Sequence, residues 1–505
     1  MAIVGAGPVG LTLAIRLAQH GVPSVLLDAQ PAHVAIGSRA ICMQRETLEI
    51  WNRAGVGERV ARRGVQWHLG RTYFGERELF SIELPASTHD HFPPFVNISQ
   101  TEVEEHLIDR SRDAGVDLRW GWRLVGLVQD ADGVDATFET DVGVRTLRAG
   151  WLIGTDGAHS AVRHALGLEF RGYSFDDRFL ICDIRARLPF PNERRFFFDP
   201  PHNPGRQVLV HPQPDDVWRI DWQVSPDTDL DEEIRGGGLD ARIRAVIGPE
   251  VDYELVWATA YRFSQRIVDR FGVGRAFLAG DAAHLMSPFG ARGLNSGVAD
   301  AENLAWKLAW VCAGRAPRAL LDSYDAERRP AALENLAVTD ATMRFMVPHG
   351  PVRRAWRNLV LRLSTRSARF RARVNSGRLA QPFSYAGSPI VAPGPDDPSL
   401  PRHGDVASDV PLPDGRLRER VGDGFVVLLA GVGPAVRERA RSAPPAEGRL
   451  LAPDDPAGVL AAIYAASGPR GWIIRPDGHL ADSGPVTARA DLEALVARLP
   501  RAIGR

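Results

Sequence analysis

The chain has 505 residues, of which 44% are hydrophobic and 24% charged, enough for two or three domains with buried cores. Its 61 basic and 62 acidic residues almost cancel, so we expect neither a nucleic acid nor a membrane as a partner. Three cysteines occur without a CxxC pair, so we expect a reducing, cytoplasmic setting with no disulfide framework, dithiol centre or metal site.

The chain opens with the pattern of a βαβ unit. An apolar run leads into the GxGxxG motif of Gly5, Gly7 and Gly10, an apolar helix follows, and Asp28 closes a second apolar run. The glycines let the backbone approach a pyrophosphate at the helix N-terminus, and the carboxylate is placed to bind ribose hydroxyls. The spacing therefore predicts a dinucleotide site, with an ordinary tight turn as the alternative.

The next elements predict an inserted sheet. A helix is expected over residues 45–53, and another begins at Gln100. Residues 118–147 have the pattern of short strands. Residues 170–262 alternate strand-like pieces with turns rich in proline and glycine, which predicts a separate antiparallel sheet between two halves of the first domain.

Long helices and a small final domain are expected after this sheet. Helices are predicted over 295–344 and 352–374. Residues 389–413 are dense in proline, aspartate and glycine, which is typical of a linker. Beyond them, 425–430 and 471–475 have the pattern of buried strands in a small α/β domain.

Two further motifs identify a family when they are taken with the first. They are the run from Gly154 to Arg163, which contains Asp156, and the run Gly280-Asp281-Ala282-Ala283-His284. In this order the three motifs resemble the fingerprints of the class A FAD-dependent aromatic monooxygenases, the para-hydroxybenzoate hydroxylase family. The sequence from 280 to 307 is most similar to the 3-(3-hydroxyphenyl)propionate hydroxylase and phenol hydroxylase branch.

The resemblance implies an α/β fold with a Rossmann-like FAD-binding domain, an inserted antiparallel-sheet substrate domain and a thioredoxin-like C-terminal domain. The last of these lacks cysteines, so its expected role is to stabilise the chain or to support a homodimer. The expected boundaries are 1–170 and 266–390 for the FAD-binding domain, with 70–97 facing the substrate, 171–265 for the substrate domain, 391–413 for the linker and 414–505 for the last domain.

The resemblance also implies a set of FAD contacts. Asp281 is expected at the ribityl chain, Arg39 near the pyrophosphate, and the backbone of residues 293–295 at the pyrimidine edge of the flavin, where a helix N-terminus stabilises negative charge. Arg45 is a weaker candidate, for which a surface salt bridge is the alternative. The full set is Gly5, Gly7, Gly10, Asp28, Arg39, Arg45, Gln100, Asp156, Asp281, Gly293, Leu294 and Asn295.

The reaction that the resemblance implies is hydroxylation of a phenolic substrate with NAD(P)H and dioxygen, through a flavin C4a-hydroperoxide. Pro288 is expected over the reacting face of the flavin. His211 and Tyr73 are candidates to bind the phenol oxygen, with a structural hydrogen-bonded role as the alternative for each. Arg219 and Arg292 are candidates to meet a substrate carboxylate, with a salt bridge or solvent contact as the alternative.

Other functions stay open at this stage. Another FAD-dependent oxygenase, such as an epoxidase, or a non-catalytic FAD-bearing sensor would share the cofactor motifs. A flavin-dependent halogenase is disfavoured, because its Trp-x-Trp-x-Ile-Pro signature is missing and so is its essential lysine. The chain has a single lysine, Lys307, which we expect to be solvated on a helix.

Overall fold

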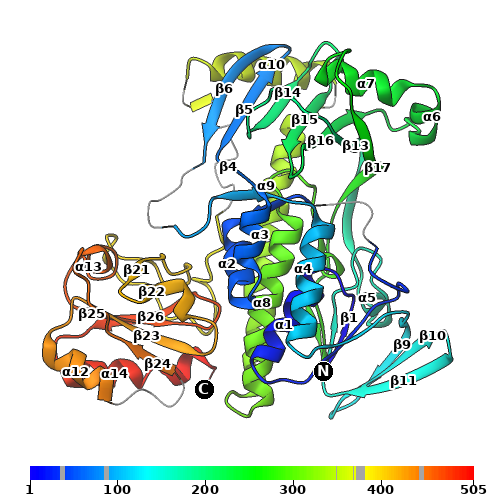
Figure 1. Ribbon diagram of the computed structural model, residues 1–505. Coiled ribbons are helices and arrows are strands. Elements are labelled where there is room, and N and C mark those ends of the chain that lie inside the picture. Colours follow the sequence, from blue (N-terminus) through cyan, green and yellow to red (C-terminus); the bar gives the residue numbers. More distant parts are fainter. Residues whose placement is uncertain are drawn as a thin grey trace.

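The computed structural model describes residues 1–34, 40–84, 90–348, 350–367, 369–370, 381–442 and 448–504. These residues form three main sheet regions, which Figure 1 shows at the lower right, at the top and at the lower left of the molecule. Long helices run between the first two regions. None of the helices in this part of the chain is long and apolar enough to span a membrane.

The first region contains a six-stranded sheet in the order β18-β19-β12-β1-β2-β8. Its strands from β19 to β8 are parallel and short, and β18 is antiparallel to β19. The predicted βαβ unit and the Rossmann-like α/β arrangement are thus confirmed. The strands are β1 (Ala2–Val4), β2 (Val25–Leu27), β8 (Asp117–Arg119), β12 (Leu152–Gly154), β18 (Gly272–Val273) and β19 (Ala276–Leu278).

Helices and two small sheets complete the core of this region. Helix α1 packs against α4 and α8, and a three-stranded antiparallel sheet, β9-β10-β11, adds Phe138 to the same core. The elements are α1 (Pro8–Gln19), α2 (Arg45–Ala54), α3 (Gly57–Arg63), α4 (Gln100–Asp113), α5 (Ala161–Ala165), β9 (Arg123–Gln129), β10 (Val134–Thr140), β11 (Gly143–Ala149), and the sheet of β3 (Cys42–Gln44), β7 (Phe95–Asn97) and β4 (Val65–Trp67).

The second region is an eight-stranded, mostly antiparallel sheet in the order β20-β17-β13-β16-β15-β14-β5-β6. It recruits β5 and β6 from before the inserted segment, because β5 pairs in parallel with β14. The strands are β5 (Leu69–Phe74), β6 (Arg77–Glu83), β13 (Arg171–Arg185), β14 (Arg194–Phe198), β15 (Gln207–Pro212), β16 (Val217–Val224), β17 (Glu254–Ile267) and β20 (His284–Leu285).

Strand alternation gives one face of this sheet a buried apolar core. Along β16, Trp218, Ile220 and Trp222 are buried in one core with Leu239 and Ile243 of α7. The intervening residues of β16 therefore point to the other face. Helices α6 (Leu230–Arg235) and α7 (Gly238–Ile247) lie beside the sheet in Figure 1, as does α10 (Pro351–Ser364).

The long helices α8 (Gly293–Cys312) and α9 (Asp322–Met346) link the first two regions. They confirm the helices predicted over 295–344. Of the helices predicted over 352–374, α10 is observed, and residues 371–380 lie outside the described residues.

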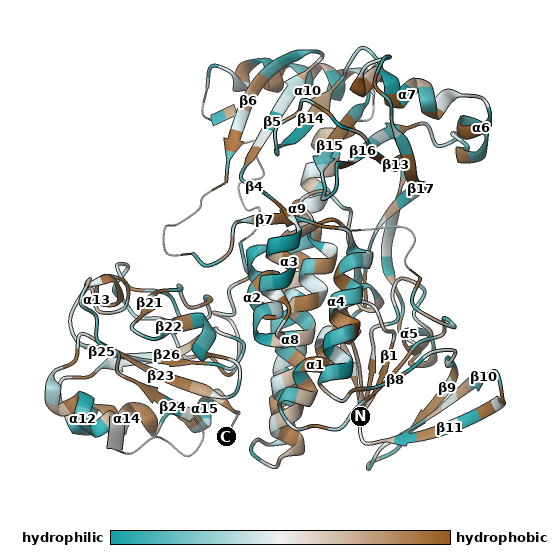
Figure 2. Cartoon of the chain, viewed as in Figure 1, coloured by the Kyte–Doolittle hydropathy of each residue, from teal (hydrophilic) through white to brown (hydrophobic). Residues whose placement is uncertain are grey.

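The third region is a four-stranded sheet in the order β24-β23-β25-β26, in which β23 pairs in parallel with β24 and antiparallel to β25. Its central strand β23 is hydrophobic along its length in Figure 2. The elements are β21 (Pro411–Leu412), β22 (Gly415–Arg416), β23 (Phe425–Ala430), β24 (Gly448–Leu451), β25 (Arg470–Ile474), β26 (Leu480–Pro485), α12 (Pro434–Ser442), α13 (Val459–Tyr464), α14 (Arg489–Val496) and α15 (Leu499–Ala502).

This C-terminal region is packed firmly onto helix α8. The rings of Trp306 and Trp310 lie 5.8 and 5.2 Å from that of Phe425 and share its buried core. The stretch predicted as a linker has an irregular backbone, yet Val391 and Leu400 are buried. The C-terminal region is therefore joined to the rest by a core rather than tethered by a free linker.

Lys307 is buried, which corrects the expectation that it is solvated. Its Nζ lies 2.7 Å from Glu327 Oε2, and neither side chain has exposed surface. Arg475 binds the same carboxylate through Nη1 and Nη2, at 2.6 and 2.9 Å, and also pairs with Asp477. We call Lys307, Glu327, Arg475 and Asp477 the Glu327 cluster; it joins α8, α9 and the C-terminal region.

Candidate functional site

One cavity of about 1460 Å³ extends from the GxGxxG turn to the eight-stranded sheet. Ordinary small-molecule pockets measure roughly 300–1,000 Å³, so this one has room for a dinucleotide and a second molecule. The predicted site residues that line it are Gly5, Gly7, Asp28, Gln100, Asp156, His211, Arg219, Asp281, Pro288, Arg292, Gly293, Leu294 and Asn295.

The three motif glycines have different roles. A Cβ on Gly5, where φ is +108°, would lie 2.5 Å from Thr155 O, and one on Gly10 would lie 2.0 Å from Gly5 O. Gly5 and Gly10 therefore allow close packing of the turn. A Cβ on Gly7 would meet no atom within 4 Å, and α1 begins beside it without a side-chain cap. This leaves open space at a helix N-terminus, the arrangement that binds a pyrophosphate.

Asp28 and Asp156 both face the cavity and both hold local backbone. Asp28 accepts hydrogen bonds from the N–H groups of Ala6, at 2.7 Å, and Gln30, at 2.8 Å. Asp156 accepts from the Ser160 hydroxyl and from the Val162 N–H at 3.1 Å, which fixes the start of α5. Burial raises the pKa of Asp156, against these hydrogen bonds.

Gln100 also combines a structural contact with a place on the cavity wall. Its Oε1 accepts a hydrogen bond from the Ala40 N–H at 3.3 Å, and its Nε2 donates to Glu104 at 2.9 Å. The backbone around Ala40 is thereby tied to the first turn of α4. Arg39, the neighbouring predicted contact, lies outside the described residues.

The turn that carries Asp281 is held from below by a buried carboxylate, Asp300. Asp300 accepts from the Gly280 N–H at 2.9 Å, pairs with His284 Nε2 at 2.7 Å and pairs with Arg328 Nε at 2.6 Å. Burial alone would raise the pKa of Asp300, but Arg328 and His284 outweigh it and hold that pKa below its usual value. Asp300 is therefore a charged support for the third motif.

The start of α8 closes the middle of the cavity. A Cβ on Gly293 would meet no atom within 4 Å, so the helix N-terminus is open to a ligand there. The Asn295 side chain instead makes hydrogen bonds within the protein. It accepts from the Gln44 N–H and the Thr47 hydroxyl, at 2.9 and 2.6 Å. Ala291, just before the helix, has a φ of +52°, a strained conformation for alanine.

The sheet end of the cavity is lined by one row of residues, one from each of six neighbouring strands. The strand register places them side by side on the face of the sheet that borders the cavity. The row is Thr259, Ile181, Asp221, Leu209, Phe196 and Thr72, all of which line the cavity. Phe179, Phe263 and Phe289 extend it as an aromatic cluster, with ring centroids 4.6 to 6.4 Å apart. The wall is thus mainly apolar, with a single carboxyl group in the row.

Two of the predicted catalytic residues have contacts that limit their roles. His211 lines the cavity, and burial, then Arg194 and Arg219, lower its pKa well below the usual value, so its imidazole is neutral. Arg219 binds Asp183 through Nε and Nη2, each at 2.8 Å. Arg219 is thus already bound to an acid, which is the salt bridge named as the alternative for this residue, and its side chain also lines the cavity.

Tyr73 points away from the cavity, which corrects its assignment to the phenol oxygen. Thr72 lines the cavity, and neighbouring residues of a strand point to opposite faces. The Tyr73 ring stacks on Phe197 at 4.6 Å. Pro288 does line the cavity, and so does Arg292, whose Nη1 donates to Asn335 Oδ1.

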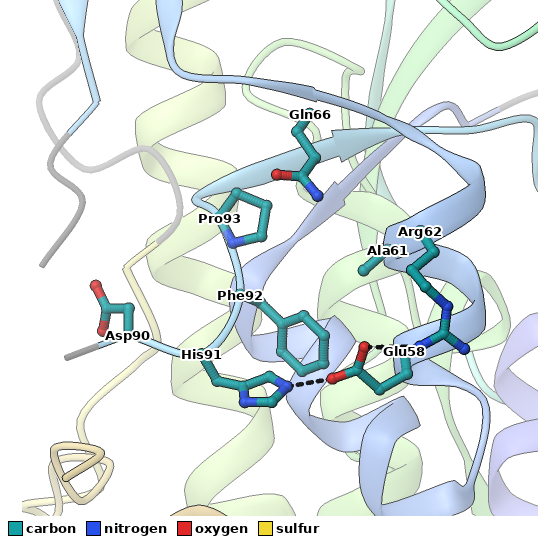
Figure 3. Close-up of a pocket in the computed structure, with 8 residues that line it drawn as sticks. All are labelled: Glu58, Ala61, Arg62, Gln66, Asp90, His91, Phe92 and Pro93. Carbon is teal, nitrogen blue, oxygen red and sulfur yellow. Dashed lines mark hydrogen bonds and ion pairs between the residues drawn. The ribbon is translucent and has the colours of Figure 1, made fainter. Parts of the chain in front are cut away.

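Arg45 is absent from the described cavity wall. It forms a salt bridge, with Nη1 2.8 Å from Asp90, which is the alternative to an FAD contact that the sequence left open. Asp90 lines a smaller pocket of about 250 Å³ beside α3. Figure 3 shows the Glu58 carboxylate of this pocket between His91 and Arg62, which bind it. Since these charges satisfy one another and no flavin-motif residue lines the pocket, we assign it no role in the reaction.

Arg194 and Asp221 are charged residues of the cavity wall that the sequence motifs did not reveal. Each stands in a strand where it alternates with residues of the opposite face. Arg194 is followed at intervals of two by Phe196 and Phe198, and Asp221 follows Arg219 in the same way. The alternation was visible in the sequence, but which face was solvated and which lined a cavity was not.

Comparisons with known proteins agree with this geometry. Residues 1–339 match the family model described as FAD binding domain. A 3-(3-hydroxy-phenyl)propionate/3-hydroxycinnamic acid hydroxylase of Mycobacterium sp. is 32% identical over 349 residues, 68% of this chain and 60% of that protein. A 6-methylpretetramide 4-monooxygenase of Streptomyces rimosus is 30% identical over 98% of this chain and 93% of its own length. A crystal structure of aklavinone-11 hydroxylase with FAD and aklavinone superposes with a TM-score of 0.81, at 25% identity, over 100% of this chain and 98% of that one.

Proposed function

Since the chain belongs to the FAD binding domain family of flavin-dependent monooxygenases, we propose that it hydroxylates a phenolic ring with NAD(P)H and dioxygen. The predicted resemblance to this family is confirmed. The single observation that carries the proposal is the continuity of the cavity, which joins a dinucleotide turn to an aromatic wall on the eight-stranded sheet.

The residues at the first-domain end fit FAD. The open space at Gly7 and at the start of α1 would take the pyrophosphate, and Asp28 the ribose. Asp281 and the open N-terminus of α8 at Gly293 would hold the ribityl chain and the pyrimidine edge. When bound there, FAD would supply electron transfer from NAD(P)H and oxygen transfer to the ring.

The chain's own part is to position the substrate and exclude water. Phe179, Phe196 and Phe289 offer ring faces and edges against which an aromatic substrate packs. An apolar wall also keeps bulk water from the reacting atoms, which protects reactive oxygen species from decay. Asp156 lines the middle of the cavity and is our candidate to contact both FAD and the nicotinamide cofactor.

Asp221 is our candidate to take the phenol proton. Its carboxyl group lies on the cavity wall, and its buried Oδ1 has no hydrogen-bond partner in the described chain. Burial raises the pKa of Asp221 to about 7, with Arg219 opposing and Asp183 reinforcing the shift. Cys42, which also lines the cavity, stays a thiol because burial raises its pKa to about 12. A carboxylate with a pKa near neutrality is suited to general-base work.

Replacing Asp221 by asparagine should lower kcat roughly 100-fold, the typical contribution of a general base. In the wild type, product formation should rise as pH increases through about 7, because the ionised carboxylate is the form that accepts a proton. This rise should vanish in Asp221→Asn. Hydroxylated product measured across pH tests it, with exposed Asp227→Asn as the control. An unchanged pH profile in Asp221→Asn would refute the assignment.

We extend the proposal to the domains. Residues 1–170 with 266–390 form the FAD-binding part and 171–265 the substrate sheet, which β5 and β6 complete. The mixed order β24-β23-β25-β26 in 414–505 supports a thioredoxin-like domain. It has no cysteine, and its packing on α8 supports a stabilising role or a homodimer contact in place of thiol chemistry.

The function is tested by NAD(P)H oxidation, oxygen uptake and product analysis over a panel of phenols. We expect bound FAD, oxidation that a phenol stimulates, and a product with one added hydroxyl. Methyl ethers of good substrates should mainly release hydrogen peroxide, because they cannot form a phenolate. Flavin without stimulated oxidation would favour a sensor, and efficient oxygenation of the ethers would favour an epoxidase or a related oxygenase.

A further inference from the structure

Arg194 is a cation on the cavity wall for which the described chain provides no ionic partner. It lines the cavity from β14, and its buried Nε has no hydrogen-bond partner. Its guanidinium lies over the ring of Phe196, 5.4 Å from the centroid. The next residue, Arg195, points to the opposite face and pairs with Glu193 at 3.0 Å. Two adjacent arginines thus differ in whether the protein neutralises them.

The remaining segments of the chain offer almost no alternative partner. Residues 35–39, 85–89, 349, 368, 371–380 and 505 contain no acidic side chain, and residues 443–447 contain one, Glu447. In the sequence, Glu447 falls between α12 and β24 of the C-terminal region. Burial lowers the pKa of Arg194, as expected of a guanidinium that no neighbouring carboxylate stabilises.

We infer that Arg194 anchors an anionic oxygen of the substrate, and that the cavity selects phenols carrying a carboxylate or an ionised second hydroxyl. The inference rests on the proposed hydroxylase function. A buried charge is costly unless it is paired, and the Arg194 guanidinium faces a space that a ligand fills. Two parallel N–H donors of one guanidinium match the two oxygens of a carboxylate, and they also bind a single ionised hydroxyl.

The sheet register suggests how such a substrate lies. Arg194 and Phe196 follow one another on the same face of β14, so an anion at the guanidinium places the attached ring beside Phe196. Asp221 is on β16, with β15 and its Leu209 in between. A substrate whose anion is at Arg194 and whose reacting phenol is at Asp221 must therefore extend across β15. His211, being neutral, does not compete for the anion.

Equilibrium binding to the FAD-loaded enzyme tests this through paired ligands. One pair is 3-(3-hydroxyphenyl)propionate and its methyl ester, and the other is alizarin and its 2-methyl ether. The wild type should bind the anionic member of at least one pair roughly 10-fold tighter or more, as read from the flavin absorbance change. The pair that shows this preference identifies the anion as a carboxylate or as an ionised hydroxyl.

The variant Arg194→Gln should weaken binding of the anionic member roughly 10- to 100-fold and leave its neutral partner within about 3-fold. Arg194→Lys should lose less affinity for the anionic member, because lysine keeps the positive charge. Arg195→Gln is the matched control and should keep the wild-type preference. If Arg194→Gln does not load FAD, the test rests on two measurements. One is the preference of the wild type within each ligand pair, and the other is the affinity of Arg194→Lys for the anionic member. A wild type with no preference in either pair, or an Arg194→Gln protein that keeps it, overturns the inference. Binding needs no turnover, so this failure is distinct from failure of the hydroxylase proposal.

Discussion

Replacing Glu327 by alanine should destabilise the protein by about 3–5 kcal/mol, the usual cost of removing one partner from a buried ion pair. The change leaves the Lys307 ammonium and the Arg475 guanidinium without their shared carboxylate, in a place where none of these side chains reaches solvent. It also removes the nearer of the two acceptors for Asn303 Nδ2, at 2.7 Å, and leaves only Asp477 at 3.4 Å. Denaturant unfolding followed by fluorescence should show the loss.

The control is Glu105→Ala on α4, whose loss of an exposed side chain should change stability by less than about 0.5 kcal/mol.

The pH dependence of stability gives a second readout. Burial opposes ionisation of Glu327, but Arg475 and Lys307 outweigh it and hold its pKa well below 4.5. A depressed folded-state pKa stabilises the native protein above the unfolded value and loses that contribution as pH falls. The fall in unfolding free energy at acid pH should therefore be shallower in Glu327→Ala than in the wild type. If Glu327→Ala and Glu105→Ala were equally stable at neutral pH, the stabilising role of the Glu327 cluster would be contradicted.

The Rossmann-like half was predictable because its signals are local. Gly5, Gly7 and Gly10 must stand at fixed spacing in one turn, and the apolar runs around them are short and continuous. The structure places them as expected, and it distinguishes Gly7, which leaves room for a ligand, from the two glycines that pack. The helices at 45–53 and 100 likewise follow from one stretch of sequence.

The substrate end was much less predictable, because its residues come from strands far apart in the chain. Whether Tyr73 or Thr72 faces the cavity depends on the register between β5 and β14, which no local pattern fixes. Arg219 looked available as a cation, but its partner Asp183 lies 36 residues earlier. Lys307 looked solvated for the same reason. Its partner Glu327 is on the next helix, and the residues that bury the pair come from the C-terminal region.

Replacing Asp300 by alanine should weaken FAD binding roughly 10- to 100-fold, the effect of losing a hydrogen bond to a charged group at a buried site. Asp300 fixes the Gly280 N–H and thereby the turn that presents Asp281 to the cavity, and without it the Arg328 guanidinium loses its carboxylate. Flavin content after purification and titration of the apoprotein with FAD measure the change. Asp409→Ala removes another buried carboxylate, the partner of Arg416 in the C-terminal region, and should cost stability without changing FAD affinity. Wild-type affinity in Asp300→Ala would show that the turn keeps its shape without this support.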